Sequence, residues 1–405
     1  MASPPLRHNT KKNRTKPKAP PIVTGKARPL YVARTDVLTA ARNRMRWIFD
    51  EFDGNVSVSN SGGKDSTVVL ELAAEVAREN EVKLKVVWLD QEAEFGSTVD
   101  YQRYIMYERD DIDFYWYQIP FKLFNGTSHD ANWLNVWGEG EEWVRPKEPN
   151  SIHENTFLDR NGKPIDRFKP LLGAMNKEMG GAILTGMRAE ESPGRRIFMV
   201  SNPCYKWVTW GSRVEGNSSA RMFHPIYDWS YRDIWKTIYD NDWRYNAMYD
   251  HMYRYGIPTR QMRVSSYSHT QALGALMYLQ ETEPETWEAA TRRLAGLSTQ
   301  AHVGNNSKMV DGLPYMFRDW EEYMHHLIDN LVTDPEAQDK FRHMYTSICT
   351  SFPHADTEVV AENVIISVML NDWTWTTINQ FVMNLRRDKR RQNEYDQMDR
   401  EEASA

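Results

Sequence analysis

The stretch VSVSNSGGKDSTVVL, residues 56–70, decides the fold of this chain. Val56 and Val58 alternate with serines as in a short strand, and the apolar residues after the glycines recur at helical spacing, at Val69, Leu72, Ala73 and Val76. Gly62 and Gly63 lie between the two patterns, where glycine allows backbone dihedrals that other residues avoid. We therefore predict a strand, a glycine turn and a helix.

This turn is predicted to bind phosphate. The first N–H groups of a helix lack intrahelical partners and carry the positive end of the helix dipole, which makes the turn an anion site. Ser61 and Ser66 add hydroxyls, Lys64 adds a positive charge, and Asp65 can cap the helix or hold a magnesium ion. A simple N-capped helix is the alternative, but strand, glycines, lysine and Asp-Ser in register favour phosphate.

Length and composition indicate a folded, water-soluble protein. The 405 residues suffice for one large domain or two ordinary ones, and 40% hydrophobic with 12% aromatic residues is typical of globular chains. Cys204 and Cys349 form no paired spacing, which argues against a disulfide framework or a cysteine-based metal site. The chain has no apolar run of membrane-spanning length and no apolar signal core, so we expect a cytoplasmic protein without a membrane partner.

Residues 1–33 are predicted to form a basic, disordered arm, because they are rich in Lys, Arg and Pro and precede the first acidic residue, Asp36. The arm is either a solubilising tail or a segment that binds nucleic acid or an acidic partner.

The rest of the chain alternates strand and helix patterns and then becomes helical. Asp36 is predicted to cap the first helix. The alternation predicts a parallel sheet with right-handed crossovers, interrupted by a Trp-rich insertion at 121–168. The predicted elements are strands at 83–89, 114–119 and 182–185, an edge strand at 206–210, helices at 98–109, 171–179 and 231–239, and helices throughout beyond 256.

A second candidate site follows the strand at 83–89. Asp90 or Glu94, at the carboxyl end of that strand, is placed to bind Mg²⁺ or a ribose hydroxyl. The alternative is that the acidic residues here are solvated loop charges.

A third candidate site is the segment from Gly186 to Arg196. Arg188 and Arg195 after a strand end suit a grip on phosphate or sulfate oxygens and would compensate charge on a leaving pyrophosphate. The alternative is a surface network of arginines and glutamates. Further on, Ser230 with Asp233 indicates a capping arrangement at a helix start, which is structural.

These elements together resemble the PP-loop ATP pyrophosphatase superfamily, in its PAPS-reductase-like branch. Ser61 to Ser66 matches the SGGxDS loop, Gly186 to Arg195 is similar to the element G-x-R-x-x-x-S-x-x-R, and Pro225 to Trp235 is similar to P-x-x-x-W-x-x-x-D-(V/I)-W. The resemblance implies an α/β fold with a Rossmann-like parallel sheet, of the adenine nucleotide α-hydrolase type, over residues 34–260. A helical C-terminal domain is then expected over 261–405.

The resemblance also implies a chemistry. Most members cleave ATP between the α- and β-phosphates, release pyrophosphate and leave AMP on an acceptor, with ATP and Mg²⁺ as cofactors. Carried over to this chain, the nucleotide would be bound by Ser61, Gly62, Gly63, Lys64, Asp65, Ser66, Asp90 and Gly186. The catalytic set would be Lys64, Asp65, Arg188 and Arg195, and the metal ligands Asp65, Asp90 and Glu94.

Two alternatives to adenylation remain open. One is processing of PAPS or adenylyl sulfate, although the C-terminal cysteine that PAPS reductases use has no counterpart after Cys349. The other is a non-catalytic, nucleotide-binding regulator. The insertion from Phe121 to Phe157 and the segment 283–287 resemble an Ibr-type subfamily on phages and plasmids, encoded beside a ParB/sulfiredoxin-like protein, with a relative that acts in DNA phosphorothioation. This resemblance implies such a protein partner and a setting in nucleic-acid modification or regulation.

Overall fold

A computed structural model describes residues 35–128, 131, 133–201, 205–206, 208–213, 220–260, 262–269, 273–298, 312–370, 372, 375 and 377–389. The predicted basic arm and Cys204 lie outside these residues. Among the helices of the described chain, none is both long and apolar enough to cross a membrane.

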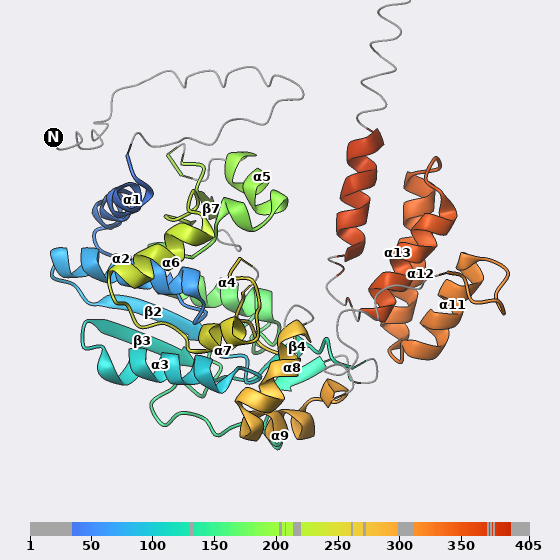
Figure 1. The fold of residues 1–405 in the computed structure, drawn as a ribbon, viewed down its shortest axis with the longest axis horizontal. Coiled ribbons are helices and arrows are strands. Elements are labelled where there is room, and N and C mark those ends of the chain that lie inside the picture. Colours follow the sequence, from blue (N-terminus) through green and yellow to red (C-terminus); the bar gives the residue numbers. More distant parts are fainter. Residues whose placement is uncertain are drawn as a thin grey trace, which may run out of the picture. The chain divides into compact units, whose positions relative to one another are not determined.

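Six strands of the described chain form one sheet in the order β3-β2-β1-β6-β8-β7 (Figure 1). β1 pairs in parallel with β2 and β6, and β6 pairs in parallel with β8. Only the pairing of β7 with β8 is antiparallel among the strand pairs described in this sheet. The predicted α/β fold with a mostly parallel sheet is therefore confirmed. The strands are β1 (Val56–Ser59), β2 (Leu84–Leu89), β3 (Ile112–Tyr117), β6 (Ala182–Leu184), β7 (Gly211–Arg213) and β8 (Arg221–Phe223).

The first helix and α6 begin at the predicted caps, whereas α3 and α4 begin at Gly96 and Phe168, earlier than the predicted starts at 98 and 171, and α5 was not predicted. Asp36 accepts a hydrogen bond from Thr39 N at 2.8 Å and caps α1, while Ser230 and Asp233 form a reciprocal capping box at α6. The segments are α1 (Val37–Glu51), α2 (Lys64–Glu79), α3 (Gly96–Glu108), α4 (Phe168–Met179), the 3₁₀ turn η1 (Ala189–Glu191), α5 (Pro193–Ser201) and α6 (Tyr231–Asp240).

The chain divides into two compact units, each discontinuous in sequence. Unit 1 comprises the chain up to Trp88, Asp100–Trp116 and Lys169–Asn246, and unit 2 comprises Leu89–Val99, Tyr117–Phe168 and the chain from Ala247 onward. The continuous domains expected from sequence, with a boundary after residue 260, stay a prediction.

Unit 1 is held by one apolar core. α2 packs on both α1 and α6, and the buried side chains of the three helices join those of the central strands. The members with no more than 2% exposure include Met45, Ile48, Val58, Val69, Leu72, Leu184, Phe223, Trp229 and Ile234.

Unit 2 contains the Trp-rich insertion and the C-terminal helices. Within the insertion, β4 (Phe121–Phe124) and β5 (Trp133–Val136) form a separate antiparallel pair. The last three labelled helices share an apolar core with Ile378, and each begins at an aspartate whose side chain accepts a backbone N–H. The helices are α7 (Met248–Arg254), α8 (Leu273–Thr282), α9 (Pro284–Arg293), α11 (Trp320–Leu331), α12 (Pro335–Ser351) and α13 (Thr357–Met369), followed by helical residues 377–389.

The edge strand predicted at 206–210 is wrong. Tyr205 and Val208 instead face each other across a tight turn, and the edge strand β7 begins at Gly211. The aromatic pattern that suggested a strand has another cause, because Trp210 packs its ring on Phe223 and Tyr227.

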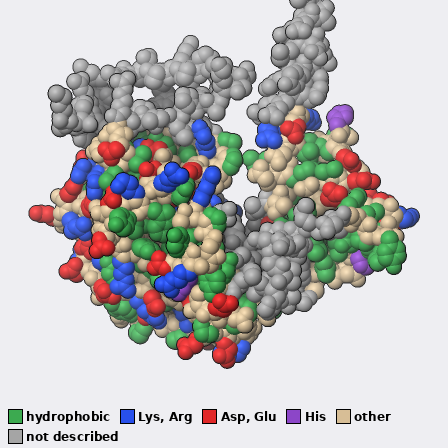
Figure 2. Space-filling view, viewed as in Figure 1, with side chains coloured by type: hydrophobic (Ala, Val, Ile, Leu, Met, Phe, Trp, Pro, Cys, Tyr) green, Lys and Arg blue, Asp and Glu red, His purple; other side chains and the backbone are tan. Residues whose placement is uncertain are grey.

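Charged side chains of both signs are interspersed over the face of the molecule shown in Figure 2. Many pair across neighbouring helices, as Arg46 does with Glu79 at 2.7 Å. Such exposed pairs contribute little to stability because water screens them.

A buried ion pair ties α1 to the segment before α6, and its loss is predicted to destabilise unit 1. Arg44 donates to both carboxylate oxygens of Asp228, at 2.8 and 2.5 Å, and to the Pro225 carbonyl, with its guanidinium 4.6 Å from the Tyr227 ring centroid. Arg44→Met leaves the Asp228 carboxylate without this partner. We expect the free energy of unfolding, measured by urea denaturation, to fall by about 3 kcal/mol.

The matched control is Arg46→Met on the same helix, whose ion pair with Glu79 is 46% exposed on both sides. Its expected cost is below about 1 kcal/mol. Equal effects of the two substitutions would contradict the importance assigned to Arg44.

Candidate functional site

The glycine turn between β1 and α2 is closed by hydrogen bonds to the Gly63 carbonyl. Gly62 has a φ of +72°, a left-handed conformation that favours glycine, and Gly63 is the extended N-cap of α2. The Gly63 carbonyl accepts from Ser66 Oγ at 2.8 Å and from Thr67 Oγ1 at 3.1 Å. Ser61 Oγ lies 3.3 Å from Ser66 Oγ, so the predicted loop residues gather in one turn.

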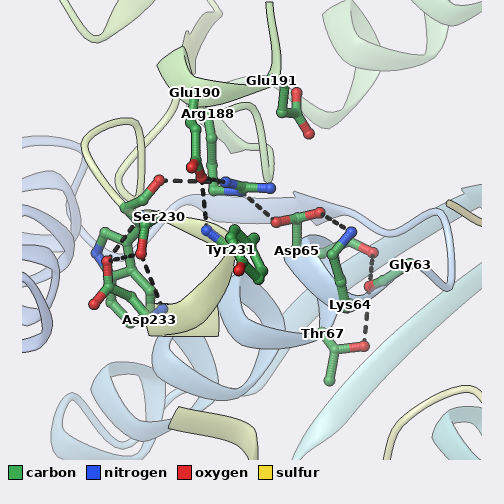
Figure 3. A network of polar contacts seen from close by, with 12 residues as sticks. Gly63, Lys64, Asp65, Thr67, Arg188, Glu190, Glu191, Ser230, Tyr231 and Asp233 are labelled. Carbon is green, nitrogen blue, oxygen red and sulfur yellow. Dashed lines mark hydrogen bonds and ion pairs between the residues drawn. The ribbon is translucent and has the colours of Figure 1, made fainter. Parts of the chain in front are cut away.

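Lys64, Asp65 and Arg188 converge at the start of α2 (Figure 3). Lys64 Nζ lies 3.2 Å from Asp65 Oδ2, and Arg188 Nε donates to Asp65 Oδ1 at 2.5 Å. The side chains of both cations are only 5% exposed. The structure thus unites three of the four predicted catalytic residues around one carboxylate.

Gly186 is required by close packing of two backbones. A Cβ built at this position would lie 2.7 Å from the Asp65 carbonyl carbon and 2.9 Å from the Ser66 nitrogen. Only glycine lets the chain after β6 approach the first turn of α2 this closely. This approach brings Arg188, two residues later, within reach of Asp65.

Arg188 is held by a second carboxylate that sequence reasoning missed. Glu190 Oε2 accepts from Arg188 Nη1 at 3.0 Å and from the Tyr231 backbone N–H at 2.7 Å, at the first residue of α6 (Figure 3). The capping box at Ser230 sets that helix start, so a motif interpreted as structural positions a candidate site residue. The only sequence signal was a glutamate two residues after the arginine.

Arg195 lies in a different ion pair. It pairs with Glu191 four residues earlier, and its side chain is 43% exposed. The contact of Arg195 therefore fits the alternative of a surface network of arginines and glutamates. Arg188, in contrast, pairs with Asp65 beside the glycine turn.

Asp90 and Glu94 belong to unit 2, where both are buried. Arg145 Nη2 donates to both Asp90 oxygens, at 2.7 and 2.8 Å, and Gln118 Nε2 donates at 2.9 Å. Burial, and secondly the Asp90 charge, raise the pKa of Glu94 to about 8. Neighbouring Glu92 pairs with Arg293 at 2.7 Å and accepts the Trp137 N–H, so these carboxyls are not solvated loop charges.

Magnesium binding by Asp65, Asp90 and Glu94 stays a prediction, because Asp65 belongs to unit 1 whereas Asp90 and Glu94 belong to unit 2. Asp65 pairs with Lys64 and Arg188, Asp90 pairs with Arg145, and burial raises the pKa of Glu94. Among the described residues, no group of three or more His, Cys, Asp or Glu side chains is arranged to hold a metal ion.

The part of the chain that includes the glycine turn matches a known protein family. Residues 55–255 match the family model described as phosphoadenosine phosphosulfate reductase domain. This match agrees with the resemblance to the PAPS-reductase-like branch that the motifs carry.

Individual relatives are distant. The chain is 28% identical to the Escherichia coli (strain K12) protein YbdN over 309 residues, which are 73% of this chain and 75% of YbdN. It is 23% identical to a phosphoadenosine 5'-phosphosulfate reductase from Xylella fastidiosa (strain M12) over 53% of this chain and 75% of that protein. A solved structure of the Candida auris phosphoadenylyl-sulfate reductase, a phosphate complex, covers 59% of this chain and 98% of its own at 12% identity, with a TM-score of 0.32.

A buried histidine beside Gly186 predicts a pH dependence of stability. His224 Nδ1 lies 2.6 Å from Thr185 Oγ1, and burial, followed by the Arg195 charge, lowers the pKa of His224 from 6.5 to about 4. Below pH 6.5 the His224 imidazole binds a proton in the unfolded chain but stays neutral in the folded protein until about pH 4. Stability is therefore expected to fall as the pH drops from about 6.5 to about 4, by a few kcal/mol at most.

Denaturant titrations at several pH values test this, with His224→Gln expected to flatten the profile in that window. His343→Gln, on the exposed side of α12, serves as the control and should leave the slope as in the wild type. A wild-type slope in the His224 variant would contradict the assignment.

Proposed function

We propose that this protein is an ATP-dependent PP-loop enzyme that cleaves ATP to AMP and pyrophosphate and adenylates an acceptor. The observation that carries the proposal is the convergence of two buried cations, Lys64 and Arg188, on the glycine turn at the start of α2. The family match over residues 55–255 supports a nucleotide substrate.

The charge arrangement suits a polyphosphate. Asp65 accepts from both cations, and Glu190 accepts from Arg188, so charge is balanced before any ligand binds. A triphosphate carries more negative charge than one carboxylate and would compete for Lys64 and Arg188 at a helix N-terminus that favours anions.

The proposed reaction uses these groups without a metal step. An acceptor atom attacks the α-phosphorus and its proton passes to solvent water, while the bond from that phosphorus to the α,β-bridging oxygen breaks and pyrophosphate leaves. Lys64 and the loop amides would stabilise the β- and γ-phosphates, and Arg188 would compensate the charge that develops on the leaving group. Arg195 would join only after leaving Glu191, and Mg²⁺ enters only as the counterion of ATP.

Processing of PAPS or adenylyl sulfate is the second candidate, because relatives carry those reductase names. A thiol-dependent reduction needs a reactive thiolate. Within the described residues the available thiol is Cys349 on α12, and burial raises its pKa, which opposes thiolate formation. We therefore place this activity second to adenylation.

The nucleic-acid setting and the ParB/sulfiredoxin-like partner are proposals that rest on the resemblance alone. Salt-dependent DNA binding that disappears when residues 1–30 are deleted would support a role for the basic arm. Tight ATP binding without turnover would favour the regulator over the enzyme.

Lys64→Ala tests the proposed role of the loop. We expect pyrophosphate release from ATP with a productive acceptor to fall at least about 100-fold in kcat/KM, because a buried cation on the phosphates is lost. Lys236→Ala on α6, whose Lys236 side chain is 72% exposed and pairs with Asp240, should retain wild-type turnover. Undiminished turnover of the Lys64 variant would overturn the assignment.

Competition binding separates the two candidate substrates. Fluorescent ATP bound to the protein is titrated with unlabelled ATP and with PAPS, and the adenylation proposal predicts that ATP displaces the probe at the lower concentration. A clear preference for PAPS would favour the second candidate.

A further inference from the structure

The amide groups around Gly62 form a chain of hydrogen bonds with one direction. The Gly62 N–H donates to Asn60 Oδ1 at 3.1 Å, and Asn60 Nδ2 donates to Gln102 Oε1 at 3.0 Å. Asn60 is 2% and Gln102 0% exposed. A backbone N–H only donates, so Asn60 must present its oxygen to Gly62 and its nitrogen to Gln102. The amide orientations therefore follow from the backbone and not from a choice of flip.

The other side of Gly62 is fixed as well. Asn246 Nδ2 donates to the Gly62 carbonyl at 3.2 Å in a buried contact. Side-chain amides thus hold both the N–H and the carbonyl of the residue with the left-handed φ of +72°. The turn is shaped by its protein neighbours before any anion arrives.

The chain of amides ends at an unsatisfied donor. Gln102 Nε2 is buried and has no acceptor among the described residues. The hydrogen bond that Gln102 makes in this chain of amides is therefore the one at its other end, where its oxygen orients Asn60. Gln102 lies on α3, 42 residues after Asn60, and no loop motif includes it.

We propose that Gln102 is a positioning residue for the nucleotide site, acting through Asn60 on the conformation of the glycine turn. This inference rests on the proposed function. Gln102 keeps the Asn60 amide in one orientation, Asn60 keeps the Gly62 N–H directed inward, and the loop amides that follow are left oriented for phosphate. Gln102 itself touches no phosphate.

Gln102→Met, which keeps the volume and removes the oxygen, tests the proposal. We expect the Kd for ATP, measured by calorimetry, to rise about tenfold, as for the loss of one buried hydrogen bond. Gln102→Glu retains an oxygen for Asn60 Nδ2 and should restore binding to within about threefold of the wild type. Gln338→Met on α12, which removes a side-chain bond to Val332 O, is the control and should leave the Kd unchanged.

A double-mutant cycle distinguishes positioning from general packing. In an Asn60→Ala background, Gln102→Met should weaken ATP binding no further, because its effect passes through Asn60. Additive losses, or a wild-type Kd in the Gln102→Met single variant, would overturn the proposal.

Hydrogen exchange of the Gly62 amide gives a readout that does not need ATP. The proposal predicts a protected amide in the wild type and faster exchange in both Asn60→Ala and Gln102→Met. If the wild type does not bind ATP, the proposed function fails. Hydrogen exchange then still tests whether Gln102 fixes Gly62 through Asn60. Equal Gly62 exchange in wild type and Gln102→Met would refute this role of Gln102.

Discussion

Two positive charges share one carboxylate at the start of α2, and the geometry of the candidate site depends on that contact. Lys64 and Arg188 come from distant parts of the sequence and would repel each other without Asp65 between them. The close approach at Gly186 delivers Arg188, and Glu190 links it to the first turn of α6. The glycine turn, the segment after β6 and the start of α6 are therefore linked by one set of charged contacts. A shift of any of these segments would break one of these contacts.

The sequence predicted the parts of this arrangement that are encoded locally. The strand, glycine turn and helix from Val56 onward follow from residue spacing, and the caps at Asp36 and Ser230 follow from short side chains before apolar runs. The fold class was predictable for the same reason. The edge strand was not, because Gly211-Ser212-Arg213 has weak strand propensity and becomes a strand only by pairing with β8.

Contacts between distant segments were beyond a single sequence. Arg145 meets Asp90 across 55 residues and Arg293 meets Glu92 across 201 residues, and no spacing rule connects them. Without those partners, Asp90 and Glu94 are typical of metal ligands at a strand end. With them, Asp90 is paired with an arginine, and burial raises the pKa of Glu94. Residue type suggested metal binding by Asp90 and Glu94, whereas the partners of these carboxyls follow from packing between distant segments.

The ion pair of Arg44 with Asp228 also has a consequence for how the protein is made. Its partners are 184 residues apart, and the core that α1 shares with α6 extends to Ile238. A ribosome must therefore synthesise most of unit 1, and also the insertion that belongs to unit 2, before Arg44 can acquire its buried partner. Nascent chains that end before Asp228 can pack α1 on α2 but lack this ion pair, so the first helix acquires its last buried partner late in synthesis.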